Sequence, residues 1–83
     1  MILNDIELVG EWLDVYTELG VTKDKTVFIQ NKTLVAVYIW LNNLAPDSKT
    51  KGIYLKSGDS ITLNGAGSSI LVVGRGIIHA YSN

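Results

Sequence analysis

The run Leu34-Val-Ala-Val-Tyr-Ile-Trp-Leu41 is the longest strongly apolar stretch of the chain and decides which folds can contain it. As an extended strand it is apolar on both faces, with Leu34, Ala36, Tyr38 and Trp40 on one face and Val35, Val37, Ile39 and Leu41 on the other. Its β-branched residues and its short length favour a strand over a helix. The pattern predicts a central strand buried on both sides, with Trp40 in the core. A second sheet would cover one side, and another subunit could cover the other.

The rest of the chain carries shorter β-type runs separated by glycine turns. They are Thr26–Asn31, Ile53–Leu55, Ser60–Asn64, Ser69–Val73 and Ile77–Tyr81, and the alternating segment Glu11–Thr17 is predicted as an edge strand. These runs predict an all-β fold, a small antiparallel β-sandwich or barrel (jelly-roll-like) of about six or seven short strands. Residues 1–10 are predicted to form an N-terminal arm, and residues 11–83 a single β domain.

Composition excludes several classes of protein. The 83 residues are 47% hydrophobic and 18% charged, which is incompatible with a disordered tail. There is no Cys, so neither disulfides nor thiolate metal sites can form, and the single His79 cannot build a two-histidine site. The net charge of −1 predicts no nucleic-acid partner, and the eight-residue apolar run is too short to span a membrane, which takes roughly 20 residues. The N-terminal sequence does not resemble a signal peptide, so synthesis in the cytoplasm is expected.

No motif in the chain predicts catalysis. Gly65-Ala-Gly67 and Gly74-Arg-Gly76 lack the following Lys-Ser/Thr of a phosphate-binding loop, so both are interpreted as hairpin turns. The clustered carboxylates of residues 5–14 show no sign of converging in a cleft. We therefore expect no enzyme activity, no cofactor and no metal site.

Association with other proteins is the favoured reading of the remaining features. Residues 1–22 contain five acids and no base, whereas residues 23–83 contain seven bases and three acids, so an acidic arm could dock on a neighbouring copy, although a solvated face explains the same charges. The aromatic residues are compatible with a core, an interface or a ligand groove. The candidate interface residues are Ile2, Leu3, Ile6, Leu8, Trp12, Tyr16, Tyr38, Trp40, Arg75 and His79.

An ordered series of short segments resembles small structural proteins of tailed bacteriophages. It comprises Trp12-Leu-Asp-Val-Tyr16, Gly20-Val21, Val27-Phe-Ile-Gln-Asn-Lys-Thr33, the Ala45-Pro46 loop, Gly52-Ile-Tyr-Leu, Ser57-Gly-Asp-Ser60 and a closing Ile-Leu-Val-Val strand. The resemblance covers roughly residues 11–81, with Ile70-Leu71-Val72 standing where such proteins tend to carry Trp. It implies a symmetric, often trimeric part of the virion, assembled in the host cytoplasm.

These observations lead to two hypotheses. The first is a homo-oligomeric virion protein, trimeric by preference, that serves as a capsid decoration or cement protein, a head-fibre protein or a tail accessory. Its partners would be itself and a capsid or tail protein. The second is a carbohydrate-binding module of a tail fibre or receptor-binding accessory protein, with Tyr38, Trp40 or Tyr54 as an exposed aromatic platform.

Overall fold

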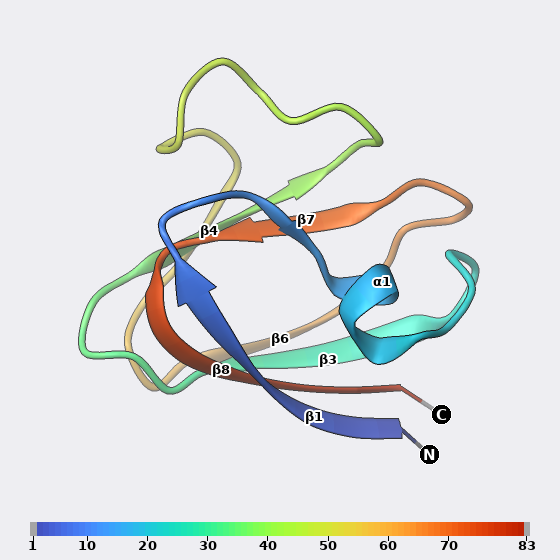
Figure 1. Cartoon of the computed structure of the whole chain (residues 1–83), viewed down its shortest axis with the longest axis horizontal. Helices are drawn as coiled ribbons and strands as arrows, with labels where there is room; N and C mark the ends of the chain where they lie inside the picture. The colour runs from blue at the N-terminus through green and yellow to red at the C-terminus, as the bar shows by residue number, and fades with distance from the viewer. Residues whose placement is uncertain (1, 83) are drawn as a thin grey trace.

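Two antiparallel four-stranded sheets face each other in the computed structural model, which describes residues 2–82 and the side chains of residues 4–82 (Figure 1). The elements are β1 (Ile2–Val9), β2 (Leu13–Asp14), α1 (Val15–Leu19), β3 (Thr26–Asn31), β4 (Val37–Leu41), β5 (Ile53–Leu55), β6 (Ser60–Asn64), β7 (Ile70–Val73) and β8 (Arg75–Ser82). The first sheet has the strand order β1-β8-β3-β6, and the second sheet has the order β2-β7-β4-β5. The prediction of a small all-β antiparallel sandwich is confirmed, with eight strands over the described residues.

The core lies between the two sheets and is built from alternate residues of the strands. Val27 and Ile29 face inward from β3, and Val37 and Ile39 face them from β4. Ile70 and Val72 of β7 and Ile78 and Ala80 of β8 complete the centre, all of them fully buried. Each such aliphatic side chain contributes about 1.5–3 kcal/mol by leaving water.

The prediction of an N-terminal arm at residues 1–10 is wrong for Ile2–Val9, because these residues form β1 and pair with β8 along their whole length. Alternation explains this placement. Ile6 and Leu8 point into the core and are each 2% exposed, while Asp5 and Glu7 point to solvent. The acidic residues that suggested a separate arm occupy the outward positions of an edge strand.

The predicted edge strand Glu11–Thr17 is also wrong beyond Asp14. Only Leu13 and Asp14 pair with β7, and Val15–Leu19 form the short helix α1. The Asp14 side chain caps the helix by accepting a hydrogen bond from the backbone N–H of Tyr16 at 3.0 Å. Gly20 ends it in the left-handed conformation at φ 71°. The helix thereby buries Val15, Tyr16 and Leu19, which an extended strand would have turned to alternate sides.

The strand predicted at Leu34–Leu41 is shorter than expected and is not covered on both sides. It begins at Val37, and Leu34 and Val35 are 96% and 57% exposed. The fully buried Asn31 side chain explains the late start. Its amide donates to the carbonyls of Val35 and Leu55, both at 2.9 Å, and its oxygen accepts from the N–H of Thr33 at 2.8 Å. These bonds bend the chain before β4 and tie the first sheet to the second.

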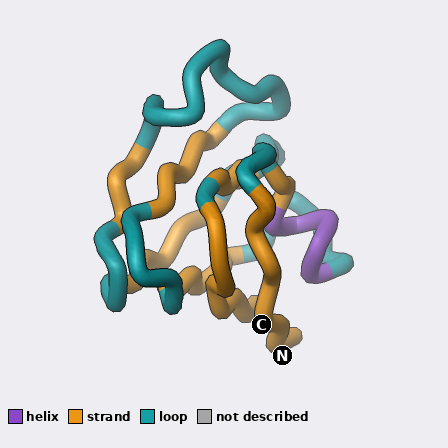
Figure 2. The backbone as a smooth tube through the Cα atoms, turned by 60° about the vertical axis from the view of Figure 1, so that its left-hand side comes forward, coloured by secondary structure: helices purple, strands orange, loops and turns teal. Residues whose placement is uncertain are grey.

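The chain passes from the second sheet to the first at Gly74, between β7 and β8, and β8 then curves beneath the sandwich (Figure 1). Glycine is required there by close packing, because a Cβ would lie 2.7 Å from Cγ1 of Val37. The Gly74 carbonyl also accepts a 2.8 Å hydrogen bond from the N–H of Gly10. In Figure 2 the helix lies to one side of the strands, and the long loop of residues 42–52 extends from the second sheet.

Candidate functional site

Over the described residues, no group of three or more His, Asp or Glu side chains could share a metal ion. Within the same part of the chain, no helix has the length and apolar character needed to cross a bilayer.

Three of the predicted interface residues are buried inside the chain itself. Ile6 and Leu8 of β1 are part of the core, and Tyr16 of α1 is 1% exposed. The Tyr16 hydroxyl donates to the carbonyl of Lys25 at 2.6 Å and accepts from the N–H of Gly65 at 2.9 Å. The prediction that these three side chains meet a partner is wrong, because they are already covered within the chain. The side chains of Ile2 and Leu3 lie outside the described residues.

Tyr38 and Trp40 lie on the outer face of the second sheet, the side turned away from the core. They alternate with the buried Val37 and Ile39, and both are half-buried. The Trp40 Nε1–H donates to the carbonyl of Leu44 at 3.1 Å, which holds the indole against the loop after β4. The prediction of a core Trp40 is wrong, since the core side of β4 is taken by the aliphatic residues.

The outer face of the second sheet is itself largely apolar. Directly across from Tyr38 and Trp40 on β7 lie Val73 and Leu71, which are nearly buried although they face away from the core. On the other flank Tyr54 of β5 pairs with Tyr38, and their rings meet edge-on at 5.5 Å and 72°. We call these five residues (Tyr38, Trp40, Tyr54, Leu71 and Val73) the aromatic face. Since the two tyrosine rings are almost perpendicular, they do not present one flat platform to a sugar.

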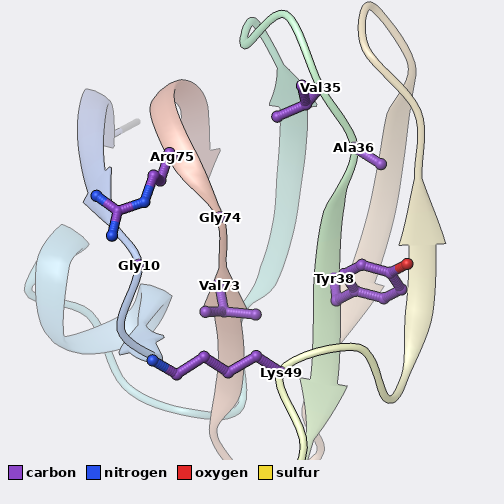
Figure 3. Close-up of a pocket in the computed structure, with 8 residues that line it drawn as sticks. All are labelled: Gly10, Val35, Ala36, Tyr38, Lys49, Val73, Gly74 and Arg75. Carbon is purple, nitrogen blue, oxygen red and sulfur yellow. The ribbon is translucent and has the colours of Figure 1, made fainter.

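A groove of about 370 Å³ opens at the β7 side of the aromatic face (Figure 3). Its lining consists of Gly10, Val35, Ala36, Tyr38, Lys49, Val73, Gly74 and Arg75. The Arg75 guanidinium packs against Gly10, and the Lys49 ammonium lies 3.6 Å from a carboxylate oxygen of Glu11. The lining therefore contains two cations and no carboxylate. Trp12, a further predicted interface residue, is half-buried near this end of β2, and its buried Nε1–H has no partner among the described residues.

His79 does not line this groove and lies on the outer face of the first sheet, between the buried Ile78 and Ala80 of β8. Its Nδ1 is 2.9 Å from Oδ1 of Asp5, its neighbour on β1, and the Lys32 ammonium is 3.2 Å from Oδ2 of the same carboxylate. The hydrogen bond to His79, followed by that to Lys32, holds the pKa of Asp5 below its ordinary value of 3.8. Arg75 lines the groove whereas His79 pairs with Asp5 outside it, so the structure does not combine the predicted residues into one site.

The structure also shows a surface that sequence reasoning missed. Phe28 of β3 and Tyr81 of β8 are direct neighbours on the outer face of the first sheet, with ring centroids 4.9 Å apart and planes inclined by 30°. They line a second pocket of about 370 Å³ together with Asp24, Lys25, Thr26 and Thr62. Phe28 alternates with the buried Val27 and Ile29, so its outward position could be predicted from the sequence. Its contact with Tyr81 could not, because that contact depends on the register of β3 against β8.

Comparison with known proteins adds no assignment: no protein-family model, no curated protein and no solved structure matches the chain. Its function is therefore inferred from its own residues and their geometry.

Proposed function

We propose that this chain is a non-enzymatic structural protein of a bacteriophage virion, a capsid decoration or cement protein or a head-fibre protein that assembles as a homo-oligomer, preferably a trimer. The observation that carries the proposal is the aromatic face, an apolar sheet surface on which Tyr54 is exposed and Tyr38 and Trp40 are only half-buried. The ordered series of segments over residues 11–81 supports the assignment to a virion.

Side-chain exposure supports an assembly role for the aromatic face. Tyr54 is 58% exposed, and apolar side chains at its borders are open to solvent as well, with Val35 57% and Leu44 78% exposed. Contiguous exposed apolar surface with aromatic residues is typical of protein interfaces. The groove cations Lys49 and Arg75 would form a polar rim that favours an acidic partner surface.

The size of the molecule fits attachment through one face. A standard interface buries about 800 Å² on each partner, a minority of the 4585 Å² that the single chain exposes. Apolar burial contributes about 25 cal/mol per Å², most of which is offset by the entropy lost on association. Several weak contacts held in one oligomer would then produce tight attachment to a repetitive shell.

The first test is the native mass of the purified protein, measured by light scattering after size exclusion at low and high salt. We expect a mass three times that of one chain, persisting in high salt because the contact is apolar. Tyr54→Glu and Val35→Glu are expected to shift the protein to monomer, while Ser60→Glu on the first sheet leaves the mass unchanged. A wild-type protein that is monomeric at all concentrations would refute the proposed oligomer. A Tyr54→Glu variant that keeps the wild-type mass would refute the aromatic face as the oligomer interface.

The second test addresses location in the virion. Phage particles would be purified from a lysate of host cells that carry the phage encoding the chain. Mass spectrometry of these particles is expected to detect the chain, with a copy number per particle that matches a capsid or fibre position. Its absence from particles that are otherwise complete would contradict the proposal.

A further inference from the structure

The pocket on the outer face of the first sheet lies on the opposite side of the sandwich from the aromatic face. Its base is a row across three strands, Thr62 on β6, Phe28 on β3 and Tyr81 on β8, placed side by side by the antiparallel register. Phe28 and Tyr81 are half-buried, and their planes are only 30° apart. Because their centroids are only 4.9 Å apart, the two rings cannot lie in one plane and pack partly over each other, unlike the edge-on Tyr38–Tyr54 pair of the second sheet; we call the tilted Phe28–Tyr81 pair the platform.

One end of the platform is bordered by polar groups of the segment 24–26. The Asp24 carboxylate accepts a hydrogen bond from the Thr22 hydroxyl at Oδ1, and this bond, the largest cause, lowers the pKa of Asp24, so that the group is ionised at neutral pH. The backbone N–H of Asp24 also hydrogen-bonds to the carboxylate and lowers its pKa further. Lys25 contributes an ammonium group and Thr62 a hydroxyl to the same lining. Acceptors and donors therefore stand next to an aromatic surface.

The polar border is held rigidly in place from behind. The buried Tyr16 hydroxyl donates to the carbonyl of Lys25 at 2.6 Å. The Asn64 amide donates to the carbonyl of Asp24 at 3.0 Å and to the hydroxyl of Thr26 at 3.2 Å. Two of these bonds hold the backbone carbonyls of Asp24 and Lys25 and the third holds the Thr26 hydroxyl, which lowers the entropy that a ligand would otherwise have to remove.

We propose that this pocket binds a neutral hexopyranose unit of a glycan. The apolar C–H face of a pyranose ring would lie on Phe28 and Tyr81, since aromatic faces are electron-rich and attract such C–H groups. Two adjacent sugar hydroxyls would donate to the ionised Asp24 carboxylate, and charge-assisted bonds of this kind are the stronger ones. Lys25 and Thr62 would bond to the remaining oxygens.

The charge of the lining favours a neutral sugar over an anionic ligand or a nucleic acid. Asp24 and Lys25 are of opposite sign and are the two charged residues that line the pocket. A phosphate or carboxylate would meet the Asp24 charge without a cluster of cations to offset it, and nucleic acid binding depends on such clusters. The inference is independent of the assembly proposed above, because the two surfaces belong to different sheets.

The test is a titration of the ¹⁵N-labelled full chain, followed by NMR, with methyl β-D-glucopyranoside, methyl β-D-galactopyranoside and methyl α-D-mannopyranoside. We expect at least one glycoside to give saturable shifts confined to the amides of residues 24–28, 62 and 81, with a Kd on the order of 1 mM, the affinity of a few hydrogen bonds and one stacking contact. Absence of saturable shifts with all three, shifts that map to the aromatic face, or tighter binding of uridine would overturn the proposal.

Two matched pairs of variants separate binding from folding. Asp24→Asn is expected to weaken the best glycoside at least tenfold, whereas Asp47→Asn, which alters another exposed carboxylate with a lowered pKa, leaves it unchanged. Tyr81→Leu keeps apolar bulk but removes the ring and is expected to abolish binding, while Tyr54→Leu on the second sheet has no effect. Dispersed amide spectra establish that each variant is folded, and equal affinities within either pair would overturn the proposal.

Discussion

The two sheets use their outer faces in opposite ways although their inner faces are alike. Both inner faces are aliphatic, with Ile29 and Ile39 fully buried at the centre. The outer face of the second sheet continues the apolar character with Trp40 and Tyr54, whereas that of the first sheet carries the Asp5–His79 pair and the Phe28–Tyr81 platform. The contrast teaches that alternation with fully buried residues, as in β3 and β4, marks the inner face of either sheet, whereas it leaves open whether the outer face is apolar or polar.

The largest effect is expected from removing the outer edge of the first sheet. Deleting residues 1–9 takes away all of β1, exposes the partner edge of β8 and removes Ile6 and Leu8 from the core. Since a small domain is stable by only about 5–15 kcal/mol, the truncated chain is expected to lose cooperative unfolding altogether. Circular dichroism during urea denaturation shows whether the truncated chain still unfolds cooperatively. A truncated chain with a wild-type transition would mean that the first sheet is complete without β1.

A pair of substitutions on β4 compares the two faces of the second sheet directly. Ile39→Ala creates a cavity in the core and is expected to destabilise the fold by about 2–5 kcal/mol. Trp40→Ala on the outer face is expected to cost less than half as much, although it removes more atoms, because its indole is half-buried. The denaturant midpoints of the two variants measure these losses of stability. A larger loss in Trp40→Ala than in Ile39→Ala would mean that the indole is buried in the core.

The Asn31 side chain connects the two sheets by hydrogen bonds, and one substitution removes it. Asn31→Ala removes the side chain that bonds to Thr33, Val35 and Leu55, and it leaves the buried carbonyl of Leu55 without that donor. An unsatisfied buried group costs about 1–3 kcal/mol, so the expected loss in the free energy of unfolding is about 3 kcal/mol. Thr62→Ala, at an exposed position of β6, serves as the control and is expected to change stability by less than about 0.5 kcal/mol. Equal stability of the two variants would show that the two sheets do not depend on Asn31.

The smallest effect concerns the polar outer surface of the first sheet. The pKa of Asp5 is lowered in the folded chain, so its pairing stabilises the fold fully above the ordinary value of 3.8 and is lost as pH falls through the lowered value. Asp5→Asn is therefore expected to lower the urea midpoint slightly at pH 7, and the difference from the wild type is expected to shrink as pH falls below 3.8 toward pH 2. A difference that persists unchanged at pH 2 would show that the carboxylate charge is not its cause.

Much of this architecture was predictable from alternation, and the failures have physical causes. β3, β6 and β7 follow the predicted runs closely because local patterning and burial agree there. β1 was missed because its outward residues include two acids, and the late start of β4 because Asn31 bonds to Leu55, 24 residues away along the chain. The Phe28–Tyr81 contact joins residues from distant parts of the sequence, so it could not be read from either segment alone.

The position of β8 has a consequence for how the protein is made. This last strand lies between β1 and β3 in the first sheet, and Ile2 pairs with Ser82. While the ribosome is still adding residues, β1 and β3 therefore lack the strand that joins them, and Ile6 and Leu8 have no sheet to complete. Pairings between distant segments form slowly, and unfinished sheets expose edges that associate wrongly. The nascent chain acquires its native first sheet only after β8 has left the ribosome, so chains truncated before β8 are expected to be substrates for chaperones and proteases rather than partly functional domains.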